Sequence, residues 1–328
     1  MTKPSEVVFL TTERSPIDTV AETVLRDFKI RHVRAPGWSV DETVLNGVAG
    51  ADAILVRLGV VTKEVMNAAS NLKVIGVHGV GVDRVDLDEA RKRGIVVTST
   101  PLANVASVAE YAVGVMISLI RDIPACDRTI KEKRWRRAKY ESKQILGKTI
   151  GIIGLGNIGS RVAKRLSCFE ANIIAYDPYV PAERFEELGV KPVSLHVLMS
   201  ESDIVTIHVP LTKLTHHMIK EKELGMMRPD AYIINTSRGA VIDEKALITT
   251  LQGNMISGAA LDVFEEEPLD PDNQLLNMQN VILTPHIAGM TTESDRRTAE
   301  TAAKDILRVL NGEKPLYEYR SELLPYPT

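Results

Sequence analysis

The chain has 328 residues, 44% of them hydrophobic, which exceeds what one compact core usually holds and provides enough apolar material for two domains. Its 40 basic and 43 acidic residues leave a net charge of −3 at pH 7, so no overall field would hold the chain on nucleic acid or on a membrane surface. We therefore expect small molecules and copies of the same chain as its partners.

Up to about residue 100, the chain alternates short β-branched runs with helix-like stretches. Alternation of this kind is typical of βαβ units around a parallel sheet. The predicted strands are Val7–Leu10, Ala53–Val56, Lys73–Val77 and Ile95–Thr98. The predicted helices are Ile17–Phe28, Lys63–Ala69 and Leu87–Arg93.

A long helical pattern covers Val105–Arg121 and is followed by a charged stretch, Lys131–Lys139. A second alternating series begins at Lys148, and its last clear helix, Thr292–Leu310, is a candidate to cross back to the first series. The strands predicted in the second series are Thr149–Ile153, Asn172–Tyr176, Ile204–Val209, Tyr232–Asn235, Gly258–Leu261 and Val281–Leu283.

The cysteine content and the lengths of the apolar runs indicate in which cellular compartment the protein works. Cys126 and Cys168 lie far apart and form no CxxC arrangement, which argues against a disulfide framework or a thiolate metal site. The apolar run before Thr11 spans four residues, too few for the core of a signal peptide, and no later run approaches the roughly 20 residues that cross a bilayer. We expect a cytoplasmic protein without a metal centre and without a membrane span.

A glycine pattern supplies the clearest local signal of a binding site. Gly154, Gly156 and Gly159, with Asn157 and Ile158 between the last two, directly follow the strand TIGII and open a helix predicted over Ser160–Phe169. Glycine removes side chains that would block a pyrophosphate, and the helix N-terminus supplies unpaired N–H donors for that anion. Ordinary turns also contain such a pattern, but its place between strand and helix favours a dinucleotide site.

Asp177 ends the next strand, 18 residues after Gly159, where a carboxylate accepts hydrogen bonds from the adenosine ribose. The negative charge would repel a 2′-phosphate, so this residue favours NAD over NADP. The alternative is that Asp177 is only a turn residue before Pro178.

Three later segments each place a polar residue just after an apolar strand, at the edge where open α/β sheets bind ligands. They are INTSRGA with Arg238, LDVFEEEP with Glu267 and VILTPHIAG with His286. Taken singly, they also fit a surface charge, a solvated acidic loop and a turn histidine. Their shared position at strand ends, in a chain with a dinucleotide pattern, favours a catalytic set.

The three residue types suit the reduction of a 2-keto acid. The guanidinium of Arg238 can hold a carboxylate and polarise a ketone, and His286 can supply the proton that the ketone oxygen gains. Glu267 would fix the imidazole through its other nitrogen. Gly289 would allow a nicotinamide to approach closely.

Seven ordered segments together resemble the D-isomer-specific 2-hydroxyacid dehydrogenase family over nearly the whole chain. They are GVGVDRVD (79–86), NVASVAEYAVG (104–114), GKTIGIIGLGNIG (147–159), HVPLT (208–212), INTSRGAVIDE (234–244), GAALDVFEEEPL (258–269) and TPHIAG (284–289). The resemblance implies an α/β fold of two doubly wound domains. Residues 1–100 plus 290–328 would form a flavodoxin-like substrate domain and residues 101–289 a Rossmann NAD-binding domain, with catalysis in the cleft between them.

The same resemblance implies roles that the residues alone do not assign. Main-chain N–H groups around His78, Gly79, Val80 and Gly81 would contact the substrate carboxylate. Further residues would lie near NAD, and these are Ser107, His208, Pro210, Thr236 and Asp262.

Within the family, the chain most resembles phosphoglycerate dehydrogenases that lack a regulatory domain. Arg57 falls where such enzymes hold a distal phosphate, whereas His78 replaces an arginine that some of them carry. Arg134, Arg136 and Arg137 are candidates to supply charge from a partner subunit, although such a run is usually a solvated face. The expected substrate is a 3-phosphoglycerate-like acid, and the alternative is a glyoxylate or hydroxypyruvate reductase.

A third hypothesis is a dinucleotide-sensing binding protein like the corepressors built on this fold, because fold alone does not define function. The helix of 105–121 with its basic extension resembles the family's dimerisation region, so we expect a homodimer. We expect no metal at His216 and His217, since adjacent side chains project in different directions on a regular element.

Overall fold

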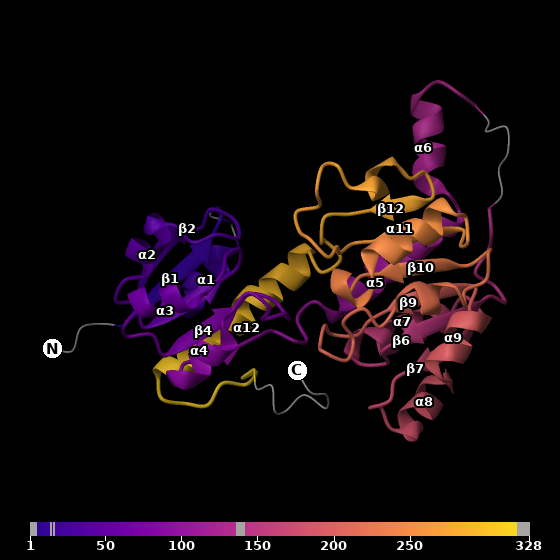
Figure 1. Cartoon of the computed structure of the whole chain (residues 1–328). Coiled ribbons are helices and arrows are strands. Elements are labelled where there is room, and N and C mark those ends of the chain that lie inside the picture. The colour runs from indigo at the N-terminus through magenta and orange to yellow at the C-terminus, as the bar shows by residue number, and fades with distance from the viewer. Residues whose placement is uncertain (1–4, 14, 16, 136–141, 320–328) are drawn as a thin grey trace. The chain divides into compact units, whose positions relative to one another are not determined.

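A computed structural model describes residues 5–13, 15, 17–135 and 142–319 of the chain (Figure 1). These residues divide into two compact units. Unit 1 comprises the described residues of Met1–Asn104 and Met290–Arg320, and unit 2 comprises those of Val105–Gly289. No helix within these described ranges combines the length and apolar content that crossing a membrane requires.

Unit 1 contains a parallel sheet in the order β2-β1-β3-β4-β5. The side chains of β1 alternate between two faces, as a strand requires. Val8 and Leu10 pack in one hydrophobic cluster, whereas Val7 and Phe9 pack in another that includes residues of α1 and α12. The strands are β1 (Glu6–Thr11), β2 (Lys29–Arg34), β3 (Ala53–Val56), β4 (Val74–Val77) and β5 (Val96–Thr98).

Helices cover both faces of this sheet. The last helix of the chain, α12, packs against β4 and α1, and a Cβ on Gly76 of β4 would lie 2.7 Å from Cδ1 of Ile306 of α12. Helix α12 therefore covers the same face of the sheet as α1, and α2, α3 and α4 supply residues to the cluster on the other face. The helices of unit 1 are α1 (Asp18–Val24), α2 (Glu42–Val48), α3 (Lys63–Ala68), α4 (Leu87–Lys92) and α12 (Thr292–Leu310).

Unit 2 contains a seven-stranded parallel sheet in the order β12-β11-β10-β9-β6-β7-β8. The strand order reverses at β6, which pairs with β7 on one side and with β9 on the other. Ligands of such sheets bind at the carboxyl end of the strands beside this reversal. The strands are β6 (Thr149–Ile153), β7 (Asn172–Tyr176), β8 (Lys191–Pro192), β9 (Ile204–Ile207), β10 (Tyr232–Asn235), β11 (Gly258–Leu261) and β12 (Val281–Leu283).

The helices of unit 2 complete a second doubly wound α/β unit, and this confirms the predicted fold class. Helix α5 packs on α7, β11 and β12, so it lies against the part of the sheet that carries the polar strand ends. The helices are α5 (Val105–Ile120), α6 (Ile123–Lys131), α7 (Asn157–Ser167), α8 (Ala182–Leu188), α9 (Leu195–Glu201), α10 (Glu221–Leu224) and α11 (Glu244–Gln252).

Candidate active site

Arg238, Glu267 and His286 follow three adjacent strands of unit 2. They come after β10, β11 and β12, which lie side by side and run parallel. Because parallel strands end at the same edge of a sheet, the topology brings the three segments to one edge.

Glu267 and His286 form a hydrogen-bonded pair. Oε2 of Glu267 lies 2.8 Å from Nδ1 of His286, and Oε1 accepts the N–H of Phe264 at 3.2 Å. The His286 side chain is 45% exposed, so the ring is fixed on one side and accessible on the other. The pair leaves Nε2 as the nitrogen that can meet a ligand.

The loop after β10 lies in contact with the loop that carries Glu267. A Cβ on Gly239 would lie 1.9 Å from the carbonyl carbon of Phe264, so only glycine permits this approach. Within the loop, Nδ2 of Asn235 donates to the main-chain oxygen of Arg238 at 2.9 Å. Nη1 of Arg238 donates to the oxygen of Ser237 at 2.8 Å. Arg238 is thus held on a braced loop beside the Glu267 segment.

The glycine loop has the shape that a pyrophosphate needs. Gly154 has φ of 90°, and a Cβ on Gly159 would lie 2.0 Å from the oxygen of Gly154, so the turn closes only with glycine at both positions. A Cβ on Gly156 would meet nothing within 4 Å, which leaves space above the loop. Gly156 is the N-cap of α7, and the N–H groups of Asn157 and Ile158 have no acceptor within the helix.

Asp177 makes two hydrogen bonds to backbone. Oδ1 accepts the N–H of Tyr179 at 3.0 Å, which is the turn role foreseen as the alternative, and Oδ2 accepts the N–H of Leu155 at 2.9 Å. Asp177 therefore braces the glycine loop. A carboxylate has about four lone-pair sites, so two remain for ribose hydroxyls.

Two predicted NAD residues carry buried polar atoms without a partner in the described chain, namely Oγ1 of Thr236 and Nδ1 of His208. Burial lowers the pKa of His208 to about 3, so its imidazole is neutral. Orphaned polar atoms that follow β9 and β10, at the carboxyl edge of the sheet, fit a bound dinucleotide. Of the other residues assigned to NAD by resemblance, Ser107 is buried in α5, Asp262 is 1% exposed and Pro210 is exposed. Gly289, predicted to let a nicotinamide approach closely, is half-buried.

In unit 1, the segment 78–81 offers fewer main-chain donors than predicted. The N–H of His78 donates to Val56 at 2.9 Å and that of Gly79 to Val77 at 2.9 Å. For Val80 and Gly81, the described chain provides no acceptor. Only the N–H groups of Val80 and Gly81 therefore remain as candidates to bind the substrate carboxylate. Their role stays a prediction.

Arg57 and His78 carry buried nitrogens, Nη1 and Nε2, that have no partner among the described residues. Burial, and then the nearby Arg57 charge, lower the pKa of His78 to about 4. Burial raises the pKa of Asp295 on α12, and Arg57 partly opposes this shift. These groups form a polar cluster with one guanidinium, one neutral imidazole and one carboxyl.

Three further residues of unit 1 carry buried polar atoms that the sequence analysis did not single out. Oγ1 of Thr98, Oγ1 of Thr100 and Oδ1 of Asn104 are also buried without a partner in the described chain. They follow or end β5, at the carboxyl edge of the sheet. Asn104 begins one of the family-like segments, which was the available signal.

The prediction about the adjacent histidines was wrong in its geometry. The rings of His216 and His217 stack with centroids 4.0 Å apart. His217 has φ of 48° and so does not lie on a regular element. Its Nε2 lies 2.7 Å from Oε1 of Glu265.

Only part of the basic cluster near α6 can be described. Arg134 forms an ion pair with Glu132, and the two side chains are 67% and 53% exposed, as on a solvated face. Arg136 and Arg137 lie outside the described residues. A charge supplied to a partner subunit stays a prediction.

A doubly wound unit with this glycine loop and with polar residues at these strand ends defines the class of dinucleotide-binding α/β domains. The family model described as "D-isomer specific 2-hydroxyacid dehydrogenase, NAD binding domain" matches residues 113–288, and the chain belongs to this family. The match confirms the resemblance seen in the sequence. Unit 2 accordingly carries the family's NAD-binding domain.

Relatives of known name fall into more than one group. A D-3-phosphoglycerate dehydrogenase of Archaeoglobus fulgidus is 41% identical over 301 residues, which cover 89% of this chain and 57% of the relative. A glyoxylate reductase of Thermofilum pendens is 44% identical over 292 residues, covering 86% and 85% of the two chains. The chain spans about half the length of the D-3-phosphoglycerate dehydrogenases that it matches.

One solved structure of similar fold is a complex with two small molecules. The D-lactate dehydrogenase of Aquifex aeolicus, in complex with NAD and lactic acid, superposes with a TM-score of 0.83 at 31% identity. The superposition covers 93% of this chain and 96% of that chain.

Proposed function

We propose that the protein is an NAD-dependent dehydrogenase that acts on C2 of a D-2-hydroxy acid or its 2-keto acid. The hydrogen bond between Glu267 and His286, in a unit with a dinucleotide loop, is the observation that carries this proposal. A histidine buttressed by a carboxylate is suited to move a proton at neutral pH.

NAD, when bound, would accept or supply the hydride. Nε2 of His286 would donate a proton to the ketone oxygen during reduction and take it back during oxidation. Glu267 would hold the ring through Nδ1 and stabilise the imidazolium. Arg238 would bind the substrate carboxylate through two parallel, bidentate hydrogen bonds.

We propose a substrate with a second, distal anion, such as a 3-phosphoglycerate-like acid. The buried Nη1 of Arg57, which lacks a partner in the described chain, supports this substrate class. A buried guanidinium nitrogen without an acceptor is costly unless a ligand supplies one.

A small neutral substrate end, as in glyoxylate or hydroxypyruvate, is the second candidate. The low pKa of His78, about 4, leaves it uncharged at neutral pH. The carboxyl of Asp295 lies close enough to Arg57 to interact with its charge. Both features reduce the positive field available to a distal anion.

A steady-state screen of NADH oxidation at neutral pH tests both candidates. The acids are phosphohydroxypyruvate, 3-sulfopyruvate, hydroxypyruvate, glyoxylate and pyruvate, compared by kcat/KM. A preference of roughly 100-fold, about 2.7 kcal/mol, for acids with a distal anion would support the first candidate. A preference for glyoxylate or hydroxypyruvate would support the second. NADH binding without turnover of any acid would contradict the dehydrogenase proposal and favour a dinucleotide-sensing protein.

We also propose a homodimer in the cytoplasm. Apolar side chains are exposed on and after α6, with Ile123 at 50%, Ile130 at 52% and Trp135 at 82%, and a second copy would cover them. Sedimentation of the wild type and of Ile130→Asp tests the dimer, which predicts a loss of mass in the variant. Cys126 and Cys168 are free thiols, as a reducing compartment favours, and cell fractionation tests this location.

A further inference from the structure

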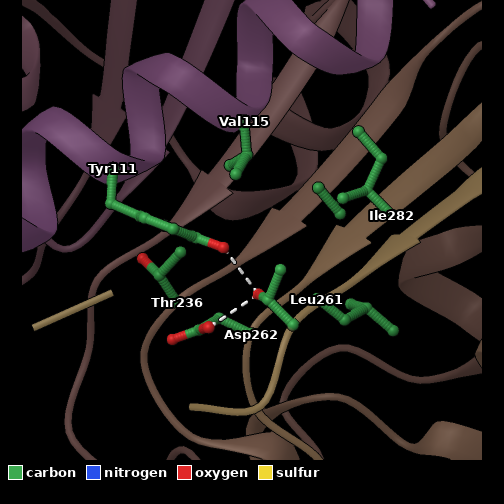
Figure 2. Close-up of a pocket in the computed structure, with 8 residues that line it drawn as sticks. Tyr111, Val115, Thr236, Leu261, Asp262 and Ile282 are labelled. Atoms are coloured by element: carbon green, nitrogen blue, oxygen red, sulfur yellow. Dashed lines mark hydrogen bonds between the residues drawn. The ribbon is translucent and has the colours of Figure 1, made fainter. Parts of the chain in front are cut away.

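Tyr111 connects helix α5 to the edge of the sheet through a chain of side-chain hydrogen bonds (Figure 2). Its hydroxyl donates to Oγ1 of Thr284 at 2.7 Å, and the Thr284 hydroxyl donates to Oδ1 of Asp262 at 2.7 Å. The side chains thus link α5 to the segments that follow β11 and β12.

Asp262 also accepts hydrogen bonds from the backbone around His286. Its Oδ1 accepts the N–H of Ile287 at 2.9 Å, and its Oδ2 accepts that of Ala288 at 2.8 Å. The main-chain oxygen of Asp262 accepts the N–H of His286 at 2.8 Å. Three consecutive amides therefore donate to this one buried residue, and the N–H of His286 also donates to the main-chain oxygen of Thr284 at 3.0 Å.

His286 needs such support because its backbone is left-handed. Its φ is 55°, a conformation that residues other than glycine rarely adopt without surrounding constraints. The bonds from the Asp262 carboxylate begin immediately after His286, so they hold the turn that aims the imidazole.

The Tyr111 hydroxyl sets the direction of the Thr284 hydroxyl. A threonine hydroxyl has one proton and rotates to suit its partners. When Tyr111 donates to it, the Thr284 proton is directed to Asp262. Burial raises the pKa of Tyr111, so the phenol stays protonated and remains a donor.

We propose that Tyr111 is a positioning residue, which acts through Thr284 and Asp262 to hold the backbone turn of His286 in its working conformation. The inference rests on the proposed dehydrogenase function, although the turn itself can be observed without turnover. Tyr111 touches neither His286 nor Glu267 in the chain of bonds, so its effect is indirect.

Tyr111→Phe removes the hydroxyl and keeps the ring. We expect kcat to fall about 10-fold, since a small misplacement of a reacting group is costly, with the Kd for NADH nearly unchanged. In the free protein, hydrogen exchange of the peptide covering 284–289 should become faster, because the Asp262 carboxylate that accepts its amides is held less firmly. Tyr232→Phe is the matched control. This half-buried tyrosine begins β10, at the opposite end of the strand from Asn235.

Thr284 variants separate the relay from a packing effect. Thr284→Val should reproduce both effects, and Tyr111→Phe should add nothing to it, because coupled residues are not additive. Thr284→Ser keeps the hydroxyl and should restore slow exchange and kcat.

Unchanged exchange of 284–289 in Tyr111→Phe would overturn the inference, as would faster exchange with unchanged kcat. Additive effects of the Tyr111 and Thr284 substitutions would also overturn it. Should the wild type turn over no 2-keto acid, the proposed function would fail, and the exchange data would still decide whether Tyr111 holds the turn.

Discussion

Glu267 contacts His286 through one carboxylate oxygen and the N–H of Phe264 through the other. The anion is therefore fixed at both ends. In Glu267→Gln the contact can persist, but the negative charge opposite the imidazolium is lost. We expect kcat to fall by about 10- to 100-fold, with the Kd for NADH unchanged, as measured by stopped-flow kinetics and fluorescence titration.

Glu266→Gln removes the same charge from the exposed neighbouring side chain and serves as control. Normal turnover is expected in this variant. Equal losses in the two variants would mean that general charge near the loop, and not the contact with His286, supports turnover.

Two glycines of the same loop predict different effects, one on stability and the other on NADH binding. Alanine at 159 would clash with the oxygen of Gly154, so Gly159→Ala should lower the free energy of unfolding by about 2 kcal/mol. Alanine at 156 meets no protein atom within 4 Å, so Gly156→Ala should fold normally. It should nevertheless weaken NADH binding about 10-fold by occupying the space for the pyrophosphate. Thermal melts and NADH titrations measure these two effects. Unchanged NADH affinity in Gly156→Ala would contradict the assignment of the pyrophosphate to this loop.

Arg57→Gln tests the distal anion directly. If Arg57 binds a phosphate or sulfonate, KM for phosphohydroxypyruvate should rise about 30-fold, the value of one hydrogen bond to a charged group. KM for glyoxylate should not change. Arg91→Gln, at a 57% exposed side chain of the same unit, is the control. Equal KM changes for both acids would contradict the assignment.

Two buried histidines predict that the protein loses stability at pH values above those at which carboxylates are protonated. Burial lowers the pKa of His208 to about 3, and burial with the Arg57 charge lowers that of His78 to about 4, from 6.5. Between these values and 6.5, the unfolded chain binds more protons than the folded chain. The stability they contribute is present above pH 6.5 and is lost as the pH falls towards the folded values.

We therefore expect the free energy of unfolding to drop on the order of 4 kcal/mol between about pH 7 and 5, with a similar share from each histidine. Urea titrations across this range measure the drop. It should shrink in His208→Gln and persist in His196→Gln, which alters an exposed residue of α9. A flat profile in the wild type would show that neither imidazole is excluded from water.

The sequence analysis located strands best where they are short apolar runs. The strands with the predicted bounds are β3, β6, β7, β10, β11 and β12, although the residues of β12 are only half-buried. The analysis missed β2, whose sequence KIRHVR buries only Val33, as befits an edge strand. It also missed α2, because Gly47 disfavours a helix. The structure explains this glycine, since a Cβ at position 47 would lie 2.6 Å from Cγ1 of Val33. Such packing depends on distant residues and leaves no local pattern.

The order of the motifs along the sequence was enough to predict the glycine loop and the residues at the strand ends. The bond between Glu267 and His286 fits that prediction. The relay from Tyr111 joins positions 173 residues apart, and no periodic pattern connects them. The same holds for the orphaned atoms of Thr98 and Asn104, since a missing partner is a property of the folded chain.

The hydrogen bond from the N–H of Leu155 to the carboxylate of Asp177 joins two groups of the chain itself. The conformational entropy of the turn is therefore lost when the chain folds, before any cofactor arrives. A loop that is ordered in advance spends none of the binding energy on its own ordering. Successive cofactor molecules can then enter and leave a turn whose backbone stays the same.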